Sequence, residues 1–245
     1  MRSGLTAILL APAALALAAS LAPAQATTTF DTSLELPATG APLGWFNGSG
    51  NPQGGFTVVT EDSIELGLRA KLRQSPNVID SPNNIYTVHR GLQNPGHALW
   101  NYEYSVDLGP DGGGRTLGDV SITLSVAKNG GPASTVDIFA LAADNSYFGA
   151  SGKIDGDPNV PDPNIPDYWA LQNSENPLFS NFPLGGYNPF ELATYSFTLS
   201  VFDDQQQLLA SNSIDVDVVP EPATLLLFGA GLAGLGVLRR RRAQA

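Results

Sequence analysis

The stretch Trp100-Asn-Tyr-Glu-Tyr-Ser-Val-Asp-Leu108 decides the fold of this chain. Large apolar side chains stand at every second position of it, and polar side chains occupy the positions between them. An alternation with a period of two predicts a strand that places one face on a core, which is typical of antiparallel sheets. We therefore expect Trp100 to be a core residue.

The same alternation recurs in both directions along the chain. It is found at 64–72, 120–126, 136–140, 195–201 and 214–218. In 64–72 the side chains of Glu65, Arg69 and Lys71, with Arg73 directly after them, are expected to form the polar face.

Turn-forming residues separate several of these strands. Asn129-Gly130-Gly131-Pro132 joins two of them, and Asp203-Asp204-Gln205-Gln206 closes the last hairpin. No run with a helical period of useful length lies between residues 27 and 219. The pattern predicts an all-β fold, an antiparallel β-sandwich of the Ig-like or jelly-roll kind over 27–219. Tyr195 is either the tyrosine corner of such a sandwich or an ordinary core aromatic.

One long segment of this domain lacks the alternation. Residues 144–188 are rich in Pro, Asp, Asn and Gly, and we expect a long irregular insertion there. Its aromatic side chains should pack parts of it onto the sandwich.

Composition excludes several classes of protein. The 245 residues include no Cys and two His, so a disulfide framework, a thiolate nucleophile and a Cys-ligated metal are ruled out. The formal net charge is −11, and a nucleic-acid partner is not expected because phosphate binding needs a basic surface. Residues 27–219 alone carry 7 basic and 22 acidic side chains, a net charge of −15.

The N-terminus is predicted to be a signal peptide over residues 1–26. Arg2 supplies the positive start, and an Ala- and Leu-rich apolar run, expected to be helical, follows it. Signal peptidase would cut after Ala26 or, as the alternative, after Ala24.

The C-terminus carries a second apolar segment. Residues 223–238 are expected to form a transmembrane helix, and the basic tail 239–245 follows them. Arg239, Arg240, Arg241 and Arg242 act as a stop-transfer signal in this interpretation, which keeps the tail cytoplasmic and the domain outside. Directly before the helix, Pro220 and Pro222 favour an extended peptide.

The motif at 219–224, Val219-Pro-Glu-Pro-Ala-Thr224, followed by the apolar segment and the arginine cluster, resembles the PEP-CTERM protein-sorting signal. In that resemblance Val219, Pro220, Glu221 and Pro222 form the sorting motif, and 219–245 is the whole signal. The resemblance implies processing by exosortase, a membrane-embedded enzyme, in a Gram-negative-type bacterium that makes extracellular polysaccharide. The domain would be anchored transiently in the inner membrane and then reach the cell envelope, the surface or the matrix.

Two weaker patterns concern ligands. Asp155, Asp157, Asn159 and Asp162 are oxygen ligands at spacings that calcium accepts, although Asp- and Pro-rich turns of secreted domains also occur without an ion. Trp45 and Trp169 are candidates for stacking on sugar rings, since both lie in loop-like sequence. No other cofactor is expected.

No catalytic constellation stands out in the sequence. His89 and His97 lack a nucleophile setting, and adjacent carboxylates are expected by chance in so acidic a domain. We expect a non-enzymatic exported surface or matrix protein. The alternatives are a carbohydrate-binding module for extracellular polysaccharide and, third, a polysaccharide-acting hydrolase.

Overall fold

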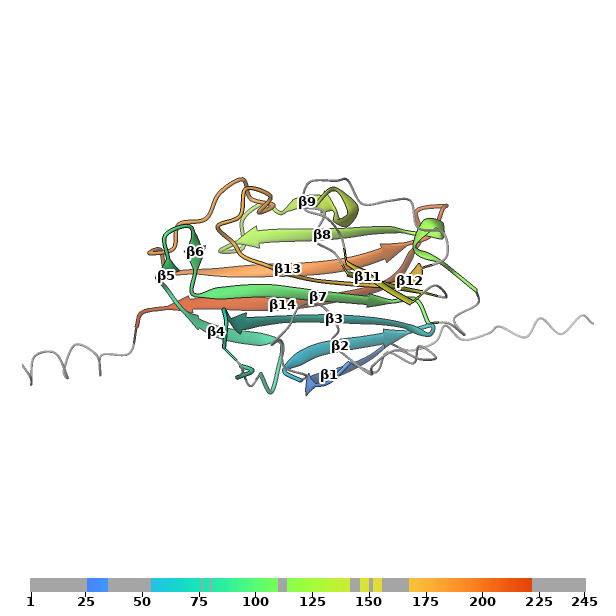
Figure 1. Ribbon diagram of the computed structural model, residues 1–245, viewed down its shortest axis with the longest axis horizontal. Helices are drawn as coiled ribbons and strands as arrows, with labels where there is room; N and C mark the ends of the chain where they lie inside the picture. Colours follow the sequence, from blue (N-terminus) through green and yellow to red (C-terminus); the bar gives the residue numbers. More distant parts are fainter. Residues whose placement is uncertain are drawn as a thin grey trace, which may run out of the picture.

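A computed structural model describes residues 26–34, 54–75, 77–79, 81–109, 114–141, 146–149, 152–155 and 168–221. Within these ranges the chain forms fourteen strands and two short 3-10 helices, arranged mainly as two sheets packed face to face (Figure 1). The expected all-β fold with two main sheets is confirmed. No helix in the described ranges is long and apolar enough to cross a membrane.

The larger sheet has seven strands and the smaller has five. In spatial order the larger contains β1 (Thr27–Thr32), β2 (Phe56–Glu61), β3 (Ile64–Leu72), β7 (Trp100–Asp107), β12 (Tyr168–Glu175), β10 (Ser146–Gly149) and β11 (Gly152–Asp155). The smaller contains β4 (Ile85–His89), β14 (Leu208–Val219), β13 (Ala193–Phe202), β8 (Ser121–Lys128) and β9 (Ser134–Asp137). A small hairpin of β5 (Leu92–Asn94) and β6 (His97–Ala98) lies beside them.

The core lies between the two sheets and is built from the alternating apolar positions. Trp100 is fully buried there and donates a hydrogen bond from Nε1 to the Tyr187 hydroxyl at 2.9 Å. Tyr195 on β13 is also buried, with its ring centroid 6.3 Å from that of Trp100. The turns after Lys128 and at 203–207 join β8 to β9 and β13 to β14, as predicted.

Two expectations about strands need correction. The sandwich is not purely antiparallel, because β4 pairs with β14 in parallel. The alternation at 136–140 does not continue as a strand, since β9 ends at Asp137 and η2 (Ile138–Ala140) follows. The Asp137 carboxylate accepts a hydrogen bond from the Phe139 amide, and such a cap favours a helical turn over further extension.

The segment 144–188 is less irregular than expected, because β10, β11 and β12 lie in it. β12 is a central strand that pairs with β7 on one side and β10 on the other. Its core-facing positions include Asn173 and Glu175, which lie opposite Tyr104 and Tyr102. Polar residues on the inner face remove the alternation that would have revealed this strand.

The polar face of β3 and β7 is largely buried, as the apolar face is. Arg69, Lys71 and Glu103 on this face are each at most 2% exposed. Opposite charges on adjacent strands compensate one another, which makes their burial tolerable.

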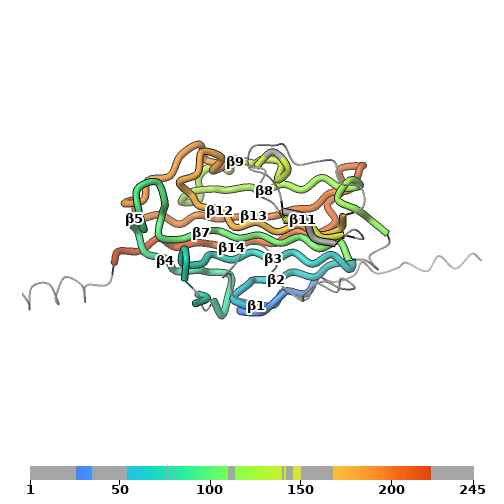
Figure 2. The backbone as a smooth tube through the Cα atoms, in the orientation of Figure 1, coloured from blue at the N-terminus to red at the C-terminus, as the bar shows by residue number. Residues whose placement is uncertain are grey.

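The two ends of the sandwich differ, and both views show them (Figures 1 and 2). We call the end where β4, β8 and β14 finish the exit end; residues 89–99 and 176–192 also lie there. The far end carries the turns of the β2–β3 and β13–β14 hairpins.

Candidate functional site

The last strand of the domain runs directly into the sorting motif. β14 ends at Val219, which is also the first motif residue, and Val219 lies opposite His89 in the parallel β4–β14 pair. The Arg90 amide donates a hydrogen bond to the Val219 carbonyl at 3.0 Å. Strand pairing therefore holds the beginning of the motif at a fixed position on the exit end.

A histidine extends this hold by one residue beyond the strand. The His89 Nδ1 lies 2.9 Å from the Pro220 carbonyl oxygen. Because a carbonyl only accepts, Nδ1 carries the proton in this contact. Pro220 and Glu221 are both exposed. The peptide is thus fixed on one side and accessible on the other.

A glycine of left-handed conformation lies beside the acid of the motif. Gly91 has φ of +131°, a conformation that side chains rarely adopt, and a Cβ placed there would lie 3.5 Å from a Glu221 carboxylate oxygen. The same Cβ would lie 3.0 Å from Leu99. Pro222, the predicted transmembrane helix at 223–238 and the arginines at 239–242 lie outside the described residues.

A second candidate site is the buried polar face of β3, β7 and β12. Glu103 is its centre: Arg69 Nε donates to Oε2 at 2.5 Å, and the Ser174 hydroxyl donates to Oε1 at 2.6 Å. Arg69 Nη2 also contacts Glu103 Oε2, and Lys71 Nζ lies 3.7 Å from Glu103 Oε1. These two ion pairs complete the charge pairing. Burial lowers the pKa of Arg69, and the charge of Glu103 opposes that shift. The layer holds a dense internal network of ion pairs and hydrogen bonds.

Two further groups complete the network at its edges. Asn176 is fully buried; its amide nitrogen donates to the Ala98 and Trp100 carbonyls and to the Asn101 side chain. At the other end, burial raises the pKa of the Asp107 carboxyl to about 6, while a hydrogen bond from the Gly109 amide opposes the shift. These groups serve the packing of the sheet.

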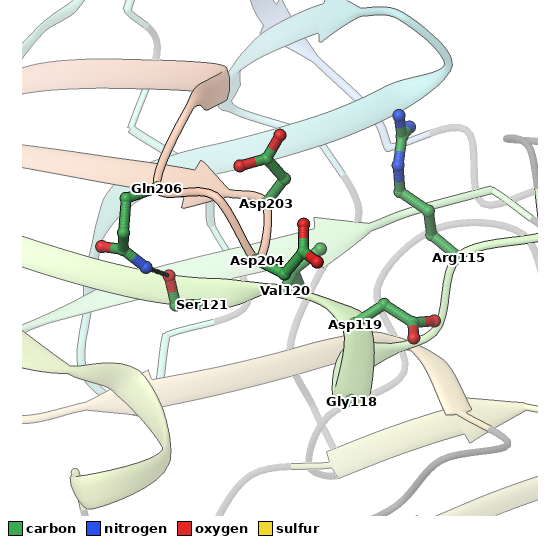
Figure 3. A pocket seen from close by; sticks show the side chains of 8 residues that line it. All are labelled: Arg115, Gly118, Asp119, Val120, Ser121, Asp203, Asp204 and Gln206. Carbon is green, nitrogen blue, oxygen red and sulfur yellow. Dashed lines mark hydrogen bonds between the residues drawn. The ribbon is translucent and has the colours of Figure 1, made fainter.

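An open depression of about 600 Å³ lies at the far end, between η1 (Leu117–Asp119) and the β13–β14 turn (Figure 3). Two of its three carboxylates are engaged locally. Asp119 accepts hydrogen bonds from the amide and hydroxyl of Thr116, and Asp203 accepts from two amides of its own turn. In the described ranges no group of three or more His, Asp or Glu side chains is arranged to hold a metal ion.

The candidate ligand residues fall mostly outside the description. Asp155 is the last residue of β11, whereas Asp157, Asn159, Asp162 and Trp45 lie in undescribed segments, so the calcium hypothesis stays a prediction. Trp169 lies on β12, half-buried, with its ring edge-on to Phe148 at 6.0 Å.

The two histidines both contact neighbours at the exit end. His97 Nδ1 lies 2.5 Å from the Asn94 side-chain oxygen, and its ring packs edge-on against Phe179. Sequence reasoning missed the role of His89, because its partner is 131 residues away in the chain. The alternation of buried Tyr86 and Val88 with exposed neighbours could have revealed β4 but not its pairing with the last strand.

An all-β domain that leads without a linker into a Pro-Glu-Pro peptide, an apolar segment and an arginine cluster defines a class: exported domains with a C-terminal sorting signal. Residues 218–242 match the family described as the PEP-CTERM protein-sorting motif. The chain therefore carries a PEP-CTERM motif at its C-terminus, which implies an exported, membrane-sorted protein that exosortase processes. A search of curated proteins found no match to this chain.

Proposed function

We propose that this chain is a non-catalytic surface or matrix protein whose β-sandwich is the delivered cargo and whose exit end presents the PEP-CTERM motif for processing. The observation that carries the proposal is the continuity of β14 with the motif at Val219, reinforced by the His89–Pro220 hydrogen bond.

The continuity matters because a processing enzyme needs an accessible and correctly directed peptide. β14 pairs with β13 over ten positions and with β4 over five, so its direction is fixed by the sheet. The last described residues, Pro220 and Glu221, follow β14 at the exit end. The folded domain thus delivers the motif in a single orientation.

The hydrogen bonds and ion pairs of the polar side chains support a non-catalytic role for the domain. His89 holds the motif, and His97 bonds to Asn94. Glu103 is neutralised by two cations, and Asp119 and Asp203 hold their own turns. General acid–base catalysis needs side chains free to exchange protons with a substrate in a cleft, and these side chains are engaged otherwise.

The charge of the domain suits a destination outside the cell. A domain of net charge −15 is soluble and resists self-association, which suits a surface or a polysaccharide matrix. The glycan-binding and hydrolase alternatives become outcomes of two screens on the purified protein. Binding on a glycan array would favour the first, and release of sugar from extracellular polysaccharide would favour the second.

Replacing the motif tests the proposal in cells. The triple variant Pro220→Ala, Glu221→Gln, Pro222→Ala should stay in the inner-membrane fraction at its uncut mass. The matched control, Asp203→Asn with Asp204→Asn, changes the far end and should be processed and exported normally. The proposal fails if the motif variant reaches the surface as efficiently as the unaltered chain, measured by fractionation and mass spectrometry.

A further inference from the structure

The exit end carries a cluster of exposed apolar side chains around the point where the chain leaves the domain. Phe190 is 59% exposed, Leu192 47% and Leu92 39%. These are three of the six large apolar side chains that stand exposed in the described ranges. We call these three residues the exit patch.

Backbone hydrogen bonds tie the exit patch to the sorting motif. The Gly91 amide donates a hydrogen bond to the Pro189 carbonyl at 2.6 Å. Gly91 precedes Leu92 in the chain and Pro189 precedes Phe190, so this bond joins the two segments of the patch. The Arg90 amide donates to Val219. The two patch segments and the start of the motif therefore form one connected surface on adjacent strand ends.

The two ends differ in net charge. At the exit end the exposed and half-exposed charges of the described residues are three cations and three carboxylates: Arg73, Arg90 and Lys128, with Glu191, Asp217 and Glu221. At the far end five carboxylates stand against Arg115: Glu61, Asp62, Asp119, Asp203 and Asp204. An otherwise strongly acidic domain thus has one partly apolar end at which the charges balance.

The chain length beyond the strand restricts where this end lies. Three residues, 220–222, separate Val219 from the predicted membrane segment that begins at Ala223. Even fully extended, that connection reaches only about 14 Å between the two Cα atoms. An anchored domain must therefore keep its exit end within a short distance of the lipid headgroups.

We propose that the exit end docks on the lipid surface while the chain is anchored, with Phe190, Leu192 and Leu92 in the interfacial region and the nearby cations against anionic headgroups. Apolar side chains flanked by basic residues are the composition that binds such interfaces. Docking would hold the sandwich end-on and fix the height of Pro220 and Glu221 above the membrane. This inference rests on the proposed membrane sorting of the chain and adds an orientation to it.

The absence of cysteine from the sequence allows single-site labelling. Leu192→Cys and Leu208→Cys each receive an environment-sensitive fluorophore, and the full chain is reconstituted in vesicles of phosphatidylethanolamine and phosphatidylglycerol containing spin-labelled lipid. Leu208 is the matched control, because it is 58% exposed and begins β14 at the far end. We expect spin-labelled lipid to quench the label at position 192 several-fold more strongly than the label at position 208.

A second variant separates docking from mere proximity. Phe190→Ser with Leu92→Ser, both exposed changes, should lower quenching at position 192 toward the level at position 208. Equal and weak quenching at both positions, in a chain that still floats with the vesicles, would overturn the docking and leave membrane sorting intact. A chain that does not float with the vesicles would overturn both.

A second copy of the chain is the other candidate occupant of the exit patch. It would shift the emission of the label at position 192 without quenching by lipid, and the shift would disappear on dilution of the protein in the vesicles. That result would overturn lipid docking in favour of contact between copies.

Discussion

Glu103 and Arg69 should be strongly coupled in stability, because both are buried and each is the main counter-charge of the other. Their side chains are 0% and 1% exposed, and Arg69 donates through Nε to a carboxylate oxygen that its Nη2 also contacts as an ion pair. Glu103→Gln keeps the shape but removes the negative charge, which leaves a buried guanidinium. Removal of one partner of a buried pair typically costs about 3–5 kcal/mol. The amide oxygen of Gln and the Gly54 carbonyl still accept from Arg69, so we expect the lower part of that range.

A double-mutant cycle measures the coupling itself. Arg69→Met with Glu103→Gln removes both charges, and its cost should fall short of the sum of the single costs by about 1–3 kcal/mol. The assay is urea unfolding of the chain in mild detergent, followed by fluorescence. A matched surface pair, Lys128→Met with Glu191→Gln, joins side chains 35% and 39% exposed and should show a coupling below about 1 kcal/mol. A Glu103–Arg69 coupling no larger than that of the surface pair would refute the reasoning.

Three more changes test the packing of the sheets. The raised pKa of Asp107 means that the folded state binds the proton of this carboxyl more tightly than the unfolded state does. The free energy of unfolding should therefore fall as pH rises from about 4 through 6, by at most about 3 kcal/mol. Asp107→Asn should remove this dependence from urea unfolding measured across that range. Asn176→Ala should cost about 2–4 kcal/mol in the same assay, because several buried backbone groups lose their partner. Gly67→Ala should cost about 1–3 kcal/mol and lower Tm, since the added methyl would overlap the Leu34 side chain; an unchanged Tm would contradict the packing described.

The sequence predicted the strands whose two faces differ most. β13 alternates buried and half-buried residues along its whole length, and β8 does so up to Ala127, so a period of two finds them without any knowledge of their neighbours. The same rule failed for β12, because Asn173 and Glu175 face the core and Gln172 faces the buried polar layer. A strand that is polar on both faces carries no periodic signal.

Long-range pairing was the second feature that local pattern could not supply. The parallel contact of β4 with β14, and with it the hold of His89 on Pro220, joins residues 131 apart. The burial of Arg69 likewise depends on Glu103, 34 residues along the chain. The choice between an Ig-like and a jelly-roll topology was left open for the same reason, since strand order is a property of the whole sandwich. By contrast, the motif at 219–222 was recognisable because all of it is local.

The size of the exit patch limits the free energy that it can contribute to docking. Each of its three side chains is already partly buried, so transfer of the remainder to lipid should contribute about 1 kcal/mol each, or about 3 kcal/mol together. That corresponds to a factor of roughly a hundred in an equilibrium constant. A domain tethered within about 14 Å of the membrane needs no more than this to stay docked, because its effective concentration is already high.

A domain separated from its transmembrane helix has only a weak affinity for the membrane. Even one myristoyl chain gives only marginal and reversible membrane binding, and the exit patch is weaker than that. The net charge of −15 also opposes return of the free domain to an anionic surface. Removal of the helix by exosortase would thus end both the anchoring and the orientation in one step. In the proposed docking, the patch would hold the motif at a defined height before the cut and would be too small to retain the product after it, which is the behaviour that delivery to the outside requires.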